Sequence, residues 1–108
     1  MNINGMTRNY LSLNLEAEDF LQHVASTIEL QLREWDEVYE VFVMKFSDYH
    51  VSVKYNEQYY DVPITEDELV ELHKRGAYEL DRKIWSQLQK QKLPIQKGFG
   101  NYIEYVLT

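Results

Sequence analysis

Three histidines are the residues of this chain best suited to acid–base chemistry or to metal binding. They are His23, His50 and His73, and no two of them have the sequence spacing of a metal-ligand pair. The chain has no cysteine, which excludes thiolate nucleophiles, disulfide bonds and cysteine-bound metals. His23 and His73 flank apolar stripes, where ordinary half-buried or surface histidines are common. The sequence therefore predicts no metal site, no cofactor and no catalytic residue.

Carboxylates are abundant, and most of them have a structural explanation. Glu66, Asp67 and Glu68 fit a helix start, where the positive end of the helix dipole favours acidic side chains. Glu40 and Glu104 fall inside expected strands, so either side chain can face inward. A general acid needs an apolar environment that raises its pKa. We expect these two carboxylates instead to point outward or to pair with a lysine on the sheet.

Most of the nine tyrosines fall on or beside expected strands. Tyrosine combines a large apolar area with a polar tip, and it is enriched where proteins bind each other. We expect several of these rings to project from the sheet face that the helices leave uncovered; the alternative is that they cover a small core. With the neighbouring carboxylates they make up the tyrosine–carboxylate surface, a candidate site for protein binding. Its members are Glu34, Asp36, Glu37, Tyr39, Glu40, Tyr55, Glu57, Tyr59, Tyr60 and Asp61.

A second motif lies near the end of the chain. Lys97-Gly98-Phe99-Gly100, followed by Tyr102-Ile103-Glu104-Tyr105, resembles part of the aromatic signature of the RNA-recognition motif. In that family a basic residue, glycines and rings on an inner strand contact bases, whereas here the pattern needs one extra residue and falls on the last expected strand. The resemblance implies nucleic-acid contacts by Lys97, Phe99, Tyr102 and Tyr105.

The helices that position these residues follow from apolar spacing. Between Leu15 and Trp35 apolar residues recur at steps of three and four, which predicts an amphipathic helix capped by Asn14. A capping box opens a second helical stripe over residues 65–92. Gly76 marks either a close contact in one long helix or a joint between two helices.

The strands follow from β-branched and aromatic residues and from alternation. Residues 38–46 are apolar at nearly every position, as in a strand covered on both faces. Residues 50–55 alternate, and residues 59–64 form a third short strand that ends at Pro63 or lies at an edge. Residues 102–107 also alternate and are expected to form a last strand.

This order of elements predicts an α+β fold. It has an N-terminal helix, a three-stranded antiparallel meander, a long helix that can be broken, and a C-terminal strand, in two layers with the helices on one face of the sheet. The first strand is expected inside the sheet, beside the last one. A length of 108 residues fits one domain over residues 1–108, with residues 1–10 as a poorly ordered or edge segment.

Charge is distributed unevenly along the chain. Residues 1–73 carry 15 carboxylates and 4 Lys or Arg, which gives −11, whereas residues 74–108 carry 3 and 7, which gives +4. The net charge of −7 disfavours binding to nucleic acid or to an anionic membrane. The start of the chain lacks the pattern of a signal peptide, and no apolar run approaches the roughly 20 residues of a membrane helix. We therefore expect a cytoplasmic protein.

These observations favour a non-catalytic acidic module that binds a protein partner with a basic surface. Small bacterial immunity proteins and phage-encoded inhibitors of defence nucleases resemble it in type, since they too are short, acidic and cysteine-free. By that analogy we expect an inhibitor of a basic or nucleic-acid-processing partner. The alternatives are a small-ligand or nucleic-acid binding module and a homo-oligomeric accessory protein. A ligand module should show an apolar pocket with converging polar groups, and an inhibitor a broad acidic patch.

Overall fold

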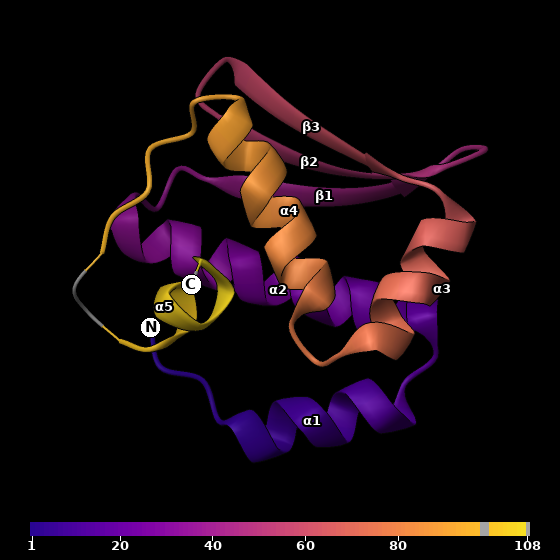
Figure 1. The fold of residues 1–108 in the computed structure, drawn as a ribbon. Coiled ribbons are helices and arrows are strands. Elements are labelled where there is room, and N and C mark those ends of the chain that lie inside the picture. Colours follow the sequence, from indigo (N-terminus) through magenta and orange to yellow (C-terminus); the bar gives the residue numbers. More distant parts are fainter. Residues whose placement is uncertain (98–99, 108) are drawn as a thin grey trace.

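The computed structural model describes residues 1–97 and 100–107 and shows a three-stranded antiparallel sheet with its helices on one side (Figure 1). The α+β prediction is confirmed. The elements are α1 (Gly5–Asn14), α2 (Ala17–Trp35), β1 (Glu40–Lys45), β2 (Tyr49–Tyr55), β3 (Gln58–Ile64), α3 (Glu66–Arg75), α4 (Glu79–Lys90) and α5 (Tyr102–Leu107).

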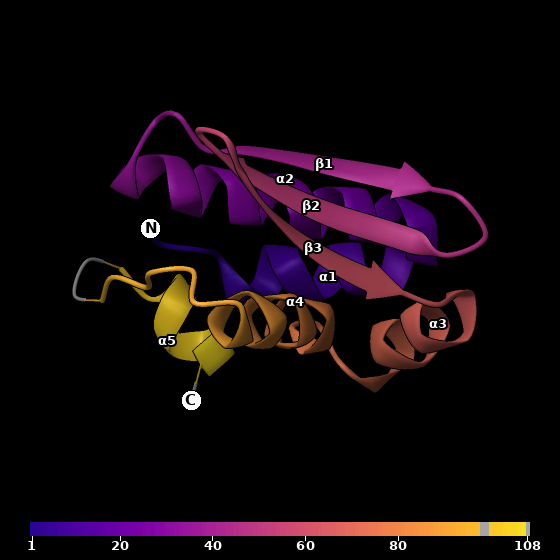
Figure 2. The same cartoon turned by 90° about the horizontal axis from the view of Figure 1, so that it is seen from above.

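The helices form two layers on one side of the sheet. In Figure 2 α2 lies behind β1 and β2 and α4 lies beside β3, and Figure 1 shows α1 on the far side of these two helices from the sheet. The core lies between sheet and helices, where Val51, Val53, Val62 and Ile64 meet the apolar sides of α2 and α4. Apolar burial on this scale is the main favourable term in folding.

The predicted amphipathic helix corresponds to α2. Its buried stripe includes Phe20, Val24, Ile28 and Leu32, each with no exposed area. The predicted cap is wrong, because Asn14 ends α1 and its side-chain amide donates to the backbone oxygen of Tyr10 at 2.7 Å. The cap position of α2 is held by Glu16, whose side chain makes no capping hydrogen bond.

The helical stripe over residues 65–92 is two helices, which resolves the alternative left open by the sequence. Thr65 caps α3 by accepting from the backbone N–H of Glu68 at 3.1 Å, as the capping box predicts. The chain is extended at Gly76, with φ 170° and ψ 169°, and this ends α3. Helix α4 then starts in a new direction and passes in front of the strands in the view of Figure 1.

The C-terminal prediction is wrong, because residues 102–107 form α5 and pair with no strand. Tyr102 and Val106 are buried four residues apart on one side of this short helix, against α4. Six residues are too few for alternation and helical spacing to be told apart by pattern alone. The sheet order is β1-β2-β3, so β1 lies at an edge and not inside the sheet.

The start of the chain is helical from Gly5 and is held to the C-terminal region. Residues 5–10 belong to α1, and the residues before them are held by Asn101 and Tyr102. Asn101 accepts from the N–H of Ile3 at 2.8 Å, and the N–H of Tyr102 donates to the Met1 oxygen at 3.1 Å. The two ends of the chain therefore lie side by side (Figure 1).

Candidate functional site

The most distinctive surface of the molecule is the outward face of the sheet. Strand residues alternate between faces, and the cross-strand register places nine of them on the side away from the helices. Within residues 1–97 and 100–107 no element lies over them, and Figure 2 looks onto this side of the sheet. We call these residues, with Phe46 of the following turn, the open face. They are Glu40, Phe42, Met44, Phe46, His50, Ser52, Lys54, Tyr59, Asp61 and Pro63.

Large apolar side chains are exposed on the open face. The exposed fractions are 41% for Phe42, 37% for Met44, 69% for Phe46 and 62% for Tyr59. Phe46 packs edge-on against the ring of His50, with the ring centres 5.7 Å apart. Single exposed apolar residues are ordinary, but several on one flat face are typical of an interaction surface.

A polar cluster lies among these apolar residues. The carboxylate of Asp61 accepts from the Ser52 hydroxyl at 2.9 Å and lies 3.0 Å from Nδ1 of His50. Because an ionised carboxylate can only accept, Nδ1 of His50 carries the proton in this contact. In a nucleophilic triad the histidine stands between the acid and the hydroxyl, whereas here the acid stands between the other two. The geometry thus fixes the positions of Ser52 and His50 but does not activate Ser52.

The outer edge of β1 is partly blocked. The backbone N–H of Val41, which is not used by β2, donates to the Glu29 carboxylate of α2 at 2.8 Å. A side chain in this position competes with a further strand, since pairing at an edge needs the strand's own donors. The open face is therefore more available to a partner than the edge is.

The tyrosine–carboxylate surface is split by the structure. The expectation that several strand tyrosines project outward is wrong: Tyr39 is 4% and Tyr60 5% exposed, and both belong to the core. Tyr60 has the inward register, as have Tyr49 and Tyr55, and Tyr39 directly precedes β1. Of the strand tyrosines, Tyr59 alone is on the open face.

Tyr39, Tyr55 and Asp36 form a packed cluster at one end of the sheet. The Tyr39 and Tyr55 ring centres are 4.4 Å apart, and the Tyr55 hydroxyl donates to Asp36 at 2.7 Å. Burial, with the nearby Tyr55, Tyr60 and Asp36, raises the pKa of Tyr39 to about 12. The bond to Asp36 raises the pKa of Tyr55. These contacts stabilise the fold and leave little of the two rings for a partner.

The carboxylates of the predicted surface have several locations. Glu40 and Asp61 lie on the open face, whereas Glu34 pairs with the Met1 amino group at 3.0 Å. Glu37 precedes β1 and Glu57 follows β2, and both are exposed. Because adjacent strands are antiparallel, these two lie at the same end of the sheet.

The residues of the RNA-recognition resemblance are not presented on a strand. Tyr102 is fully buried, and its hydroxyl donates to Asp81 at 2.5 Å. Tyr105 is 45% exposed, but it stands on α5 with its ring 5.7 Å from that of Tyr78. Lys97 lies in the preceding loop, and Phe99 lies outside the described residues. The structure brings together no row of stacking rings from these residues.

The three histidines lie on three different elements, His23 on α2, His50 on β2 and His73 on α3. His23 faces α1 from α2, and burial, with the Arg8 charge, lowers its pKa. Nε2 of His73 lies 2.8 Å from the backbone oxygen of Ser12, which joins α3 to α1. No three His, Cys, Asp or Glu side chains among the described residues are placed to hold a metal ion.

Sequence reasoning missed a buried ion pair. Nη1 of Arg8 lies 2.6 Å from the carboxylate of Asp81, and both side chains are inaccessible to solvent. A lone arginine between Thr7 and Asn9 gives no periodic signal, since a charged residue at such a position is normally a surface residue.

Comparisons with family models, curated proteins and solved structures gave no match. No helix in the described part of the chain combines the length and the apolar character needed to cross a bilayer.

Proposed function

We propose that this protein is a non-catalytic module that binds a basic protein through the open face of its sheet. The observation that carries the proposal is the exposure of Phe42, Met44, Phe46 and Tyr59 on one uncovered surface. Buried aromatic anchors supply most of the affinity in protein interfaces, and residues around them exclude water.

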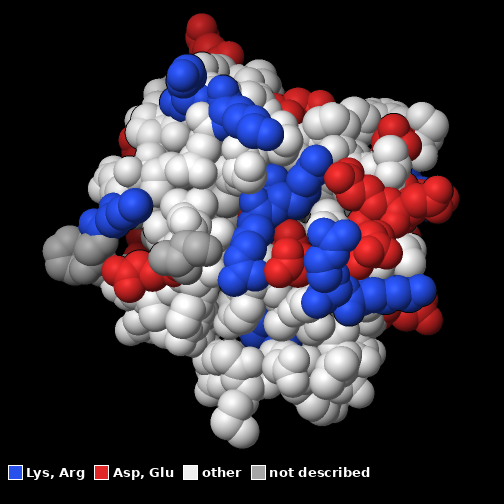
Figure 3. All heavy atoms as spheres, viewed as in Figure 1, with Lys and Arg blue, Asp and Glu red and all other residues white. Residues whose placement is uncertain are grey.

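The charges around the open face favour a basic partner. Glu40 and Asp61 outnumber Lys54 on the face, and the exposed Glu37 and Glu57 lie at one end of it. The Lys and Arg side chains over α3 and α4 are interspersed with carboxylates (Figure 3), and three of them pair with Glu68, Glu71 and Glu79. The carboxylates on and beside the open face attract a positively charged surface before contact is made.

The polar cluster supports the same interpretation. A carboxylate has about four acceptor positions, and two contacts of Asp61 are made to Ser52 and His50. Its remaining positions suit an arginine or lysine of a partner, and the carboxylate is already held in place. A contact group that is fixed before binding loses less entropy when the complex forms.

The test is capture from nuclease-treated lysate at low and moderate salt, followed by reconstitution with the purified candidate. The tagged wild type is compared with the double variant F42S/F46S and with L13S. Leu13 is 75% exposed on α1, so its substitution removes a similar exposed apolar side chain elsewhere. We expect the wild type and L13S to retain one basic protein in stoichiometric amount, and F42S/F46S to lose it.

Two outcomes would contradict the proposal. Equal retention by F42S/F46S would place the contact outside the open face. Recovery of the protein alone, with concentration-dependent sedimentation of the wild type but not of F42S/F46S, would instead assign the open face to a second copy of this chain.

A further inference from the structure

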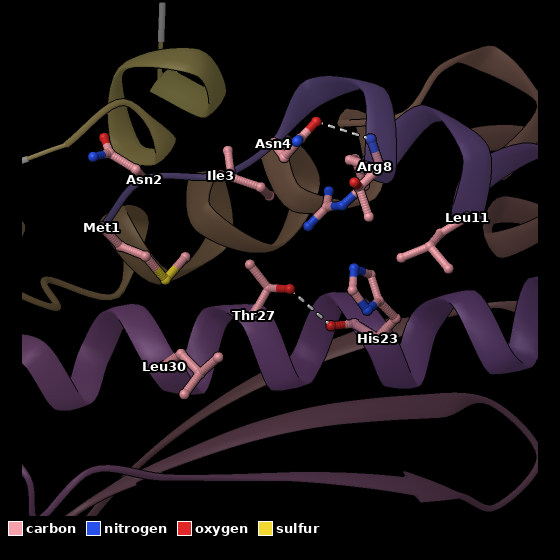
Figure 4. A pocket seen from close by; sticks show the side chains of 10 residues that line it. Met1, Asn2, Ile3, Asn4, Arg8, Leu11, His23, Thr27 and Leu30 are labelled. Atoms are coloured by element: carbon pink, nitrogen blue, oxygen red, sulfur yellow. Dashed lines mark hydrogen bonds between the residues drawn. The ribbon is translucent and has the colours of Figure 1, made fainter.

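A surface cavity lies between α1 and α2, on the opposite side of α2 from the sheet (Figure 4). Its volume is about 180 Å³. Met1, Ile3, Leu11 and Leu30 supply apolar walls, and Arg8 lines its inner side. Figure 4 shows the guanidinium group of Arg8 extending from α1 towards His23 and Thr27 of α2.

Arg8 uses only part of its hydrogen-bonding capacity. Its Nη1 donates to Asp81 at 2.6 Å and to the Ala77 oxygen at 3.1 Å. Among the described residues, Nε and Nη2 have no hydrogen-bond partner, although the residue is only 1% exposed. The rings of Tyr78 and Phe20 lie 4.9 and 5.7 Å from the guanidinium carbon, and they offer no acceptor to donors in its plane.

The two unpartnered donors belong to one edge of the guanidinium plane. Nε–H and the neighbouring Nη2–H point the same way, and this parallel pair matches two oxygens of a single planar acceptor. Leaving charged donors buried without an acceptor is unfavourable. The edge is therefore suited to a carboxylate.

The charge at Arg8 and the size of the cavity further limit which ligand can bind. Asp81 already balances the charge of Arg8, so a single additional negative charge fits better than a dianion such as phosphate. The apolar walls fit a short hydrocarbon chain. Cavities of about 150 Å³ accommodate a molecule of the size of benzene, which has about six heavy atoms. Butyrate, with four carbons and two oxygens, has the same number.

We propose that the cavity between α1 and α2 binds a short-chain monocarboxylate, held by the Nε and Nη2 edge of Arg8 with its alkyl chain against Met1, Ile3, Leu11 and Leu30. The acid enters from the solvent side of the cavity, and Arg8 keeps its bond to Asp81.

The experiment is an NMR titration of the ¹⁵N-labelled protein with sodium butyrate, with sodium chloride at equal ionic strength as the control. We expect saturable shifts of the Arg8 side-chain Nε–H signal and of the amides of Thr7 and Thr27. Butyramide, which has the same chain without the charge, should bind at least tenfold more weakly. Absence of saturable shifts at Arg8, or equal binding of butyramide, would overturn the proposal.

Two variants locate the site. R8M/D81N removes the buried charge together with its counter-charge, and we expect it to lose butyrate binding while circular dichroism shows a folded protein. T27L keeps Arg8 and fills part of the cavity, and it should weaken binding at least tenfold even if R8M/D81N fails to fold. S26L replaces Ser26, the exposed neighbour of Thr27 on α2, and serves as the control for T27L. Unchanged affinity of T27L would also contradict the assignment.

Discussion

Arg8 and Asp81 join the first helix to the fourth, with Nη1 of Arg8 2.6 Å from Oδ1 of Asp81. The second oxygen of Asp81 accepts from Tyr102, whose hydroxyl also accepts from Nε1 of Trp85 at 3.1 Å. Burial raises the pKa of Asp81, and Arg8 and the Tyr102 hydroxyl oppose that shift. One buried network thus connects α1, α4 and α5, which are distant in sequence.

The substitution R8M should destabilise the protein strongly. It leaves the Asp81 carboxylate buried without its counter-charge, and breaking such a pair typically costs about 3–5 kcal/mol. The measurement is urea unfolding followed by circular dichroism. The matched control is R75M, because Arg75 pairs with Glu71 at 3.1 Å with both side chains more than half exposed. We expect that control to change the free energy of unfolding by less than about 1 kcal/mol; a similar loss in both variants would mean that burial of the pair is unimportant.

The substitution G100A should also destabilise the protein. Gly100 has φ +101°, and an added Cβ would meet the backbone of Met1. Because neither the conformation nor the contact tolerates a side chain, we expect a loss of about 1–3 kcal/mol and weaker attachment of residues 1–4. G76A is the control, since Gly76 is extended and its Cβ would have ordinary contact with the Glu79 side chain at 3.4 Å. Thermal unfolding measures the loss of stability in G100A and in G76A. An equal loss in the two variants would contradict the special role of Gly100.

Stability should fall at alkaline pH, in part through Tyr39. Its folded pKa of about 12 lies above the ordinary tyrosine value of 10.0, so the folded state keeps a proton that the unfolded state releases. The contribution is fully present below pH 10 and is lost as the pH rises towards 12. Unfolding of the wild type and of Y39F is compared over this range. We expect a shallower decline for Y39F, and parallel curves would show that Tyr39 ionises normally.

The sequence was informative where apolar spacing is regular, and less so where polar residues or short segments decide the structure. The stripe of α2 and the hairpins of β1 to β3 repeat over enough residues to be identified. Helix α1 was missed because its buried residues include Arg8 and Ser12 rather than an apolar stripe. The sequence of α5 predicts a strand because a segment of six residues fits the two-residue period of a strand as well as the period of a helix.

Only part of the tyrosine–carboxylate surface was predicted correctly, because alternation is informative about one property of a strand and not about another. Alternation tells which strand residues share a face, but it does not tell which face the helices cover. The prediction that Tyr39 and Tyr60 face outward is therefore wrong, because both rings are buried in the core. Glu40, Tyr59 and Asp61 do lie on the open face. The apolar run over residues 38–46 predicts a strand covered on both faces, whereas the helices cover only one face, so Phe42, Met44 and Phe46 are exposed.

Charge reversal at Glu37 and Glu40 should slow association with the basic partner. Long-range attraction acts mainly before contact, so E37K/E40K should lower the association rate and its salt dependence with little change in dissociation. Both residues are exposed, and E40K places a lysine directly opposite Lys54, so the free energy of unfolding should change by about 1 kcal/mol or less. Stopped-flow association at two salt concentrations measures this. An unchanged association rate would mean that the carboxylates do not steer the partner.

The most direct test of the central claim is calorimetric titration of the captured basic protein with wild type, F42S/F46S and L13S. Loss of two anchors at about 2 kcal/mol or more each corresponds to a fall in affinity of roughly 700-fold or greater for F42S/F46S. L13S should bind as the wild type does. Equal affinities for all three proteins would contradict the assignment of the open face as the binding surface.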